Sequence, residues 1–177
     1  MSPARAFVGL GSNLSHPRRQ LARALRAIAR LPGVRIVAVS PHYASAPVGN
    51  PAPQPDYVNA VVAVRTTLSP RALLAALHRI ERRQQRRRER EAHRNAPRTL
   101  DLDLLLYGRR RARQHGLALP HPRLHERAFV LRPLVDVAAA ATVPGRGLAR
   151  RFLGAVRDQR IVRTRAHVLR QGRAGTG

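Results

Sequence analysis

The sequence predicts an α+β fold, a ferredoxin-like sandwich in which helices pack on a mainly antiparallel sheet. The first observation is the order of its regular segments, strand-helix-strand-strand-helix-strand, which is the split βαβ arrangement of such sandwiches. The second is that apolar residues alternate in the strand segments but recur three and four apart in the helical ones. The length of 177 residues suits one domain, and 44% hydrophobic residues suffice for a core. Because only 3% of the residues are aromatic, we expect that core to be aliphatic.

The first half of the chain is predicted to contain three strands and one helix. Apolar runs bounded by turn residues place strands at 5–10, 34–40 and 57–66. In the helix between the first two strands, Ser15 is the expected N-cap and Pro17 fits the first turn. Residues 45–56 contain four prolines and a glycine, and we expect an irregular loop there, which in a compact domain is usually functional.

The second half is predicted to add a helix, a strand and several short pieces. The helix begins at residues 69–70, buries leucines up to Ile80 and then carries an arginine-rich face until it becomes a loop between 88 and 97. A strand at 99–107 and a short strand near 111–117 follow, then short helical pieces at 123–139 and a last small helix at 148–156. We expect a single domain over residues 1–162 and a basic, mobile tail over 163–177.

The formal net charge of +25 would suit a nucleic-acid-binding protein. All 34 basic residues are arginine, however, and they are spread over the whole chain, which indicates coding bias more than a selected phosphate surface. The charge should still attract polyanions such as nucleotides, and salt should weaken that attraction. The chain has no long apolar segment, no visible signal peptide and no cysteine, so we expect a cytoplasmic protein without disulfides or thiolate zinc sites.

Two aspartates carry most of the functional information. Asp101 and Asp103 are two of only nine acidic residues, and they alternate with leucines in the run 97–107. On a strand, both carboxylates point to the same face, roughly 6–7 Å apart. That pair suits one or two hard divalent cations, or basic side chains nearby, although two aspartates on a solvated sheet face would show the same pattern.

Other catalytic signatures are missing from the sequence. It contains no cysteine nucleophile, no G-x-S-x-G elbow, no Walker A loop and no G-x-G-x-x-G loop. An acidic pair together with many arginines is the equipment of phosphoryl transfer without a covalent intermediate. In such sites metal ions clamp the phosphates and arginines neutralise the charge that develops.

The chain resembles a known family, the 6-hydroxymethyl-7,8-dihydropterin pyrophosphokinases of folate biosynthesis. The most specific stretch is Pro-Arg-Thr-Leu-Asp-Leu-Asp-Leu-Leu at 97–105. Further matching stretches, in the family's order, lie at 9–14, 55–61, 80–81, 88–90, 95–96, 119–123 and 127–131. The resemblance implies transfer of the β,γ-diphosphate of ATP to the hydroxymethyl group of the pterin, with release of AMP. It also implies two Mg²⁺ ions, with Asp101 and Asp103 as their ligands.

The resemblance assigns further residues to the site. Catalytic roles fall on Arg88, Arg90, Arg98, Asp101 and Asp103. The pterin would bind to Ser45, Pro47, Val48, Tyr57, Asn59 and Phe129. ATP would bind to Glu81, Arg94, Arg98, Leu104, His121 and Arg127.

The chain departs from the family's pattern at three places. About two additional residues between Glu81 and Arg88 leave open whether Arg88 and Arg90, or Arg86 and Arg88, hold the catalytic positions. Asn95 stands where some members have Trp, and Ser45 begins a Ser-Ala-Pro stretch in place of Thr-x-Pro.

Two other functions remain open at the level of the sequence. A basic, RNA-associated binding protein could use the same sandwich. Such sheets usually bind RNA through aromatic residues, however, and this chain has only three Phe and three Tyr. A catalytically inactive relative is the other alternative, although the acidic pair, Asn59 and His121 are all present. We expect a monomer that binds ATP and the pterin alcohol, with neither a membrane nor a specific nucleic acid as partner.

Overall fold

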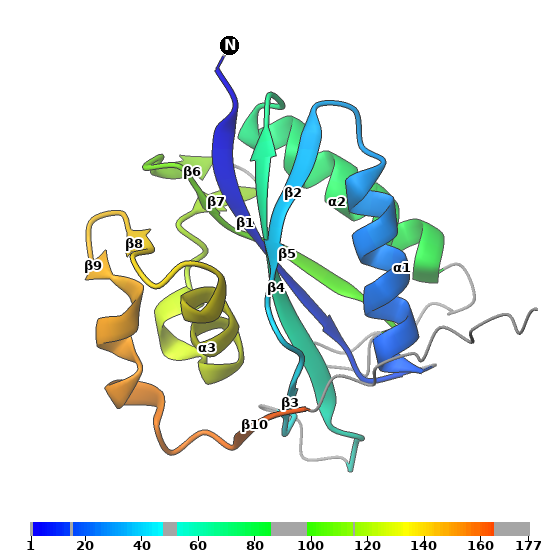
Figure 1. Cartoon of the computed structure of the whole chain (residues 1–177), viewed down its shortest axis with the longest axis vertical. Helices are drawn as coiled ribbons and strands as arrows, with labels where there is room; N and C mark the ends of the chain where they lie inside the picture. The colour runs from blue at the N-terminus through cyan, green and yellow to red at the C-terminus, as the bar shows by residue number, and fades with distance from the viewer. Residues whose placement is uncertain (1, 15, 48–52, 86–98, 115, 165–177) are drawn as a thin grey trace, which may run out of the picture.

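Figure 1 shows the computed structural model of the chain, which describes residues 2–14, 16–47, 53–85, 99–114 and 116–164. Within these residues, one antiparallel sheet has six strands: β1 (Ala4–Ser12), β2 (Val34–Val39), β3 (Tyr43–Ser45), β4 (Tyr57–Thr66), β5 (Asp101–Tyr107) and β10 (Ile161–Arg163). The order is β10-β3-β4-β1-β5, and β2 pairs with the second half of β4 while β3 pairs with the first.

Helices cover both faces of this sheet (Figure 1). α1 (Pro17–Ala29) and α2 (Pro70–Gln85) pack on one face, and α3 (Ala128–Val137) packs on the other. The remaining described elements are short: β6 (Ala112–Gln114), β7 (Leu117–Leu119), β8 (Thr142–Val143), β9 (Gly147–Leu148) and the 3₁₀ helices η1 (Leu124–Glu126), η2 (Ala149–Phe152) and η3 (Gly154–Val156). The strand order and the antiparallel pairing confirm the predicted ferredoxin-like α+β fold.

The central strand β1 separates two hydrophobic cores because its side chains alternate between the faces. Ala6, Val8 and Leu10 are buried against α1 and α2, in a core that includes Leu21, Ile28, Leu73, Leu77 and Leu102. Phe7 belongs to the core under α3, with Val61, Leu105, Leu106, Leu131 and Leu134. Gly9 and Gly11 continue the row of Phe7, so this face of β1 loses its side chains toward the end of the strand.

Some short elements differ from the sequence-based expectations. The expected N-cap, Ser15, lies outside the described residues, and the structure has His16 at the N-cap in a left-handed conformation (φ 63°) with no side-chain cap. The prediction of Ser15 as the cap was therefore wrong. The residue before a proline avoids the helical region, which moves the boundary to His16.

The other differences concern segments of two to four residues. The strand expected near 111–117 is a hairpin, β6–β7, that turns at Gly116 (φ 74°). The helix expected at 148–156 is divided into β9 and two 3₁₀ helices. β3 and β10 were not predicted, and β10 pairs Arg163 with Tyr43, so ordered structure continues past the expected domain end at 162. The rest of the expected tail, residues 165–177, lies outside the described part of the chain.

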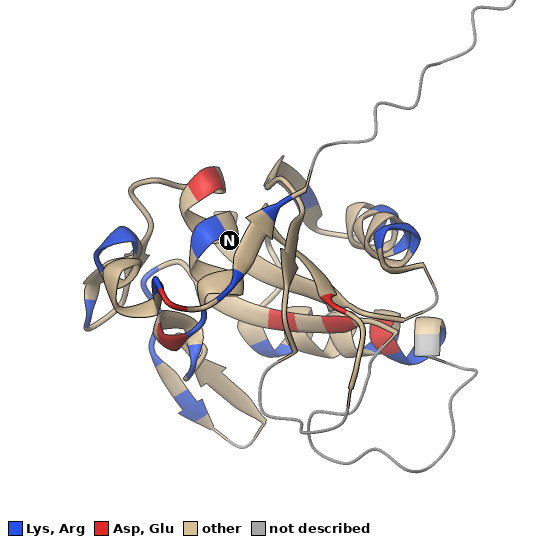
Figure 2. Ribbon diagram, turned by 90° about the horizontal axis from the view of Figure 1, so that it is seen from below, with Lys and Arg blue, Asp and Glu red and all other residues tan. Residues whose placement is uncertain are grey.

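Basic residues occur on many elements of the structure. Figure 2 shows arginine-bearing segments, in blue, distributed over the helices, hairpins and turns instead of being gathered on one face. This agrees with the interpretation that the net charge is a property of the whole chain. In the described part of the chain, no helix has the length and apolarity needed to cross a membrane.

We expect Leu77→Ala to lower the free energy of unfolding by about 2–5 kcal/mol, because Leu77 is completely buried under the sheet and its removal leaves a cavity. Leu74→Ala, on the same helix but only partly buried, should cost clearly less. Urea denaturation of both variants measures the difference. Equal losses would show that α2 does not pack as the structure has it.

Candidate active site

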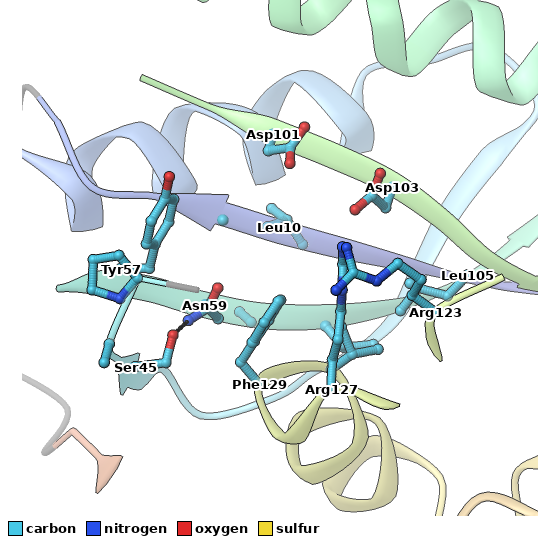
Figure 3. A pocket seen from close by; sticks show the side chains of 17 residues that line it. Leu10, Ser45, Tyr57, Asn59, Asp101, Asp103, Leu105, Arg123, Arg127 and Phe129 are labelled. Atoms are coloured by element: carbon cyan, nitrogen blue, oxygen red, sulfur yellow. Dashed lines mark hydrogen bonds between the residues drawn. The ribbon is translucent and has the colours of Figure 1, made fainter. Parts of the chain in front are cut away.

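A cavity of about 210 Å³ lies on the face of the sheet that carries α3. β1, β3, β4 and β5 form one side of this cavity, and residues at and before the start of α3 form the other (Figure 3). The cavity brings together eight of the predicted site residues: Ser45, Pro47, Tyr57, Asn59, Asp101, Asp103, Arg127 and Phe129. Because Arg127 is among them, an expected ATP-binding residue lines the same cavity as the expected pterin-binding residues.

Glycines on β1 form the floor of this cavity. Gly11 pairs with Asp101 on one neighbouring strand and with Asn59 on the other, and Gly9 pairs with Asp103 and with Val61. A Cβ atom at Gly11 would lie 3.3 Å from Asn59 Oδ1, closer than most side chains tolerate. The floor is therefore open because two successive residues on this face lack side chains. Glycine at alternate positions of a strand is the sequence signal that could have predicted this opening.

The acidic pair lies where strand alternation predicted it. Asp101 and Asp103 point from β5 across β1 into the cavity, with the Asp103 side chain 37% exposed (Figure 3). The described residues contain no group of three or more His, Cys, Asp or Glu side chains that could enclose a metal ion. Two carboxylates fit Mg²⁺ nonetheless, since this ion usually takes one or two carboxylates and completes its shell with substrate phosphates and water.

The other end of the cavity is suited to a flat, polar ring. Asn59 donates from Nδ2 to Ser45 Oγ at 2.8 Å and to the carbonyl of Tyr43 at 3.4 Å. Because both bonds use the amide nitrogen, Oδ1 is the acceptor that Asn59 offers toward Gly11 and the cavity. The rings of Tyr57 and Phe129 lie around the same end (Figure 3).

We expect Ser45→Ala to weaken pterin binding by about 3- to 10-fold, the equivalent of one neutral hydrogen bond. The reason is that Asn59 loses the acceptor that fixes the orientation of its amide. Ser45→Thr keeps a hydroxyl at this position and should bind nearly as the wild type does. Calorimetric titration with the pterin measures both affinities, and an unchanged affinity in Ser45→Ala would contradict the orienting role.

Positive charge gathers at the end of the cavity near Asp103. Arg123 and Arg127 both line the cavity, and the Arg127 guanidinium also lies 5.5 Å from the centre of the Phe129 ring. Burial, followed by the positive charge of Arg123, lowers the pKa of Arg127, while Asp103 and Asp101 act in the opposite direction. Arg127 remains charged at neutral pH, as arginines do.

His121 lies beside this end of the cavity as a neutral ring. Burial and the charges of Arg127 and Arg123 lower its pKa, against the effect of Asp101. Its Nδ1 accepts the backbone N–H of Arg123 at 3.3 Å, which places the proton of the neutral ring on Nε2. Nε2 is 3.9 Å from Asp103 Oδ1, too far for a hydrogen bond.

Besides His121, two of the predicted ATP-binding residues that the structure describes do not line the cavity. The Leu104 side chain is 4% exposed and belongs to the core under α1 and α2, on the opposite face from Asp101 and Asp103. Glu81, on α2, accepts the backbone N–H of Leu102 at 2.6 Å through Oε1. Both therefore lie at the β5 edge of the sheet. The predicted residues Val48, Arg88, Arg90, Arg94 and Arg98 lie outside the described part of the chain.

The Gly-Ser-Asn stretch connects the segments around the site. Ser12 is completely buried, and its hydroxyl donates to the carbonyl of Thr99 at 2.6 Å. The Asn13 amide donates to Gln54 Oε1 and to the carbonyl of Pro55. The end of β1 is thus tied to the segment before β5 and to the segment before β4, the two strands that carry Asp101 and Asn59.

Comparison with known proteins decides the family. The model of the 7,8-dihydro-6-hydroxymethylpterin-pyrophosphokinase (HPPK) family matches residues 7–139, which is most of the chain. The chain belongs to this family. A 2-amino-4-hydroxy-6-hydroxymethyldihydropteridine pyrophosphokinase from Pseudomonas aeruginosa is 50% identical over 140 residues, covering 79% of this chain and 84% of that protein. A protein of the same name from Haemophilus influenzae is 42% identical over 158 residues, covering 89% of this chain and 96% of that protein.

Solved structures of HPPK domains share the fold. A Plasmodium falciparum HPPK-DHPS protein, solved with pterin and p-hydroxybenzoate, superposes with a TM-score of 0.64 at 13% identity, covering 86% of this chain. This chain spans 43% of that longer protein. Membership of the HPPK family confirms the resemblance seen in the sequence and makes the chain a pyrophosphokinase of folate biosynthesis. Nothing in these comparisons supports the RNA-binding alternative.

Proposed function

We propose that this cavity transfers the β,γ-diphosphate of ATP to the hydroxymethyl group of 6-hydroxymethyl-7,8-dihydropterin. The observation that carries the proposal is the presence of two different binding chemistries in one cavity. An aromatic and amide end, with Phe129 and Asn59, is joined to an end with paired carboxylates and arginines. A pterin fits the first end and a polyphosphate fits the second.

The pterin would lie between the Tyr57 and Phe129 rings. Aromatic rings bind a flat heterocycle by stacking, and such contacts depend on the ring geometry as well as the buried area. Asn59 Oδ1 would accept an N–H of the pterin edge, since the amide nitrogen is used by Ser45 and Tyr43. Pro47 lines this end of the cavity, and Val48 would extend the same wall.

Asp101 and Asp103 would hold Mg²⁺, two ions in the assignment that we propose, against the phosphates of ATP. When bound, these ions neutralise the phosphate oxygens and make the β-phosphorus more electrophilic. The carboxylates also act on the arginines of the cavity, because Asp103 and Asp101 both favour the charged form of Arg127. The carboxylates and Arg127 would thus hold the polyphosphate from opposite sides.

In the proposed reaction, the hydroxymethyl oxygen of the pterin forms a bond to the β-phosphorus, and its proton is released to water. The bond between this phosphorus and the oxygen that bridges it to the α-phosphorus breaks, and its electron pair leaves with AMP. Arg127 would neutralise charge on the diphosphate while it moves, an effect that is large in a site with little water. Neutral His121, with its proton on Nε2, would donate a hydrogen bond to a phosphate oxygen.

The nucleoside part of ATP would lie along the edge formed by β5. Leu102 directs its backbone N–H away from β1 toward Glu81, so alternate peptide groups of β5 face this edge. Leu104, two residues on, would bind ATP through its peptide group and not through its buried side chain. Arg88, Arg90, Arg94 and Arg98 would complete the phosphate-binding set, with Arg86 and Arg88 as the alternative to the first two.

The direct test is magnesium-dependent formation of AMP from ATP in the presence of the pterin alcohol. The expected result is one AMP for each pterin diphosphate, with no AMP when the alcohol is omitted. Release of ADP, or AMP formation that does not depend on the alcohol, would contradict the proposal. Binding of RNA with no turnover would instead favour the binding-protein alternative.

A further inference from the structure

We propose that Arg123 is an additional polyphosphate-binding residue, which grips the transferred diphosphate together with Arg127. This inference rests on the proposed function, and it concerns a residue to which neither the sequence pattern nor the family resemblance assigned a role. Arg123 precedes η1 and lines the cavity, as Asp103 and Phe129 do. Figure 3 shows its side chain reaching the cavity next to that of Arg127.

Arg123 lines the same cavity as the groups that would hold the pterin and the metal ions. The pterin end of the cavity is marked by Phe129 and the metal-binding end by Asp103, and Arg123 lines the cavity together with both. In the proposed reaction, the diphosphate must lie between the hydroxymethyl group and the carboxylates. A guanidinium at this place can make two parallel hydrogen bonds to phosphate oxygens.

Electrostatics around Arg123 also favour an anionic ligand. Arg123 and Arg127 are close enough that the charge of Arg123 lowers the pKa of Arg127, and it acts on His121 in the same direction. Two like charges in one cavity repel each other, and that repulsion is removed when a polyanion lies between them. The aspartates on β5 compensate only in part, because they would themselves bind metal ions.

The local structure holds Arg123 near this position without burying it. Its backbone N–H donates to His121 Nδ1, and its Nε lies 3.8 Å from Glu126 Oε2. Both side chains of the ion pair are about half exposed, at 54% and 55%, so the pair by itself is weak. The alternative is that Arg123 serves only this surface ion pair, and Glu126→Gln tests that alternative directly.

The experiment compares Arg123→Ala, Arg123→Gln and Arg123→Lys with Arg151→Ala, an exposed arginine on η2 that does not line the cavity. The first readout is the affinity for an ATP analogue with a methylene bridge between its α- and β-phosphorus, measured by calorimetry with Mg²⁺. We expect Arg123→Ala and Arg123→Gln to weaken it about 10- to 100-fold, as for one charge-assisted contact. Arg123→Lys should recover part of the loss. In all three Arg123 variants, the affinities for AMP and for the pterin should change less than about threefold.

The second readout is turnover with saturating pterin. Arg123→Ala should raise the KM for ATP and lower kcat, whereas Arg151→Ala and Glu126→Gln should keep kcat within about twofold of the wild type. Unchanged analogue affinity in both Arg123→Ala and Arg123→Gln would overturn the proposal, as would an equal loss in Arg151→Ala. If the wild type failed to form AMP, the proposed function would fall, yet the titration with the ATP analogue would still measure the contribution of Arg123.

Discussion

Replacing either aspartate of the cavity, Asp101→Ala or Asp103→Ala, is expected to lower kcat by at least about a thousandfold. Each carboxylate would supply a ligand for Mg²⁺, and the described residues offer no larger cluster of ligands that could compensate for its loss. The metal would contribute several kcal/mol to stabilising the charge that moves toward the bridging oxygen. Loss of one ligand should also raise the Mg²⁺ concentration needed for half-maximal activity in whatever turnover remains.

The same two variants should fold normally. Asp101 and Asp103 share one face of β5 and are only partly buried, so their replacement leaves no cavity in the core and relieves the repulsion between them. We therefore expect thermal unfolding at the wild-type temperature or slightly above it. Asp158→Ala, at a side chain that is 95% exposed, is the matched control and should keep full activity. Activity close to the wild type in either Asp101→Ala or Asp103→Ala would end the assignment of metal binding to this pair.

The second large effect is expected at the pterin end of the cavity. Asn59→Ala should weaken pterin binding by about 5- to 150-fold, because a polar group of the ligand would be buried without a partner, at about 1–3 kcal/mol. Phe129→Ala should weaken it by a similar factor through loss of the stacked ring. Neither variant should change the affinity for AMP, which the proposal places at the β5 edge of the sheet.

Two further variants separate these effects from general destabilisation. Phe152→Ala removes a partly buried ring that packs edge-on against His125 and does not line the cavity, so it should lower stability without changing pterin affinity. Asn59→Asp keeps the size of the side chain but replaces the amide nitrogen that donates to Ser45 and Tyr43. Calorimetric titration of the four variants with the pterin would refute this binding site if Asn59→Ala and Phe129→Ala bound as tightly as the wild type.

The principal elements of the fold were predictable because their signals are local. Alternating apolar residues and helical stripes identified β1, β2, β4, β5, α1 and α2, and their order along the chain implied the sandwich. The same alternation is enough to place Asp101 and Asp103 on one face of a strand. Segments of two or three residues, such as β3 and β10, contain too few positions for a periodic pattern. They are strands because residues about 120 positions apart pair with each other, as Tyr43 does with Arg163.

The fold class, the acidic pair and the family all follow from the amino-acid sequence alone, since each is indicated by patterns within short segments of the chain. Which of these residues share a cavity depends on the arrangement of the chain in three dimensions. That arrangement places Gly9 and Gly11 between the acidic strand and Asn59, and it adds Arg123 beside Arg127. It also turns the Leu104 side chain away from the cavity. A binding site is formed by contacts between distant strands and loops, and their register depends on the packing of the whole sheet and not on any local pattern.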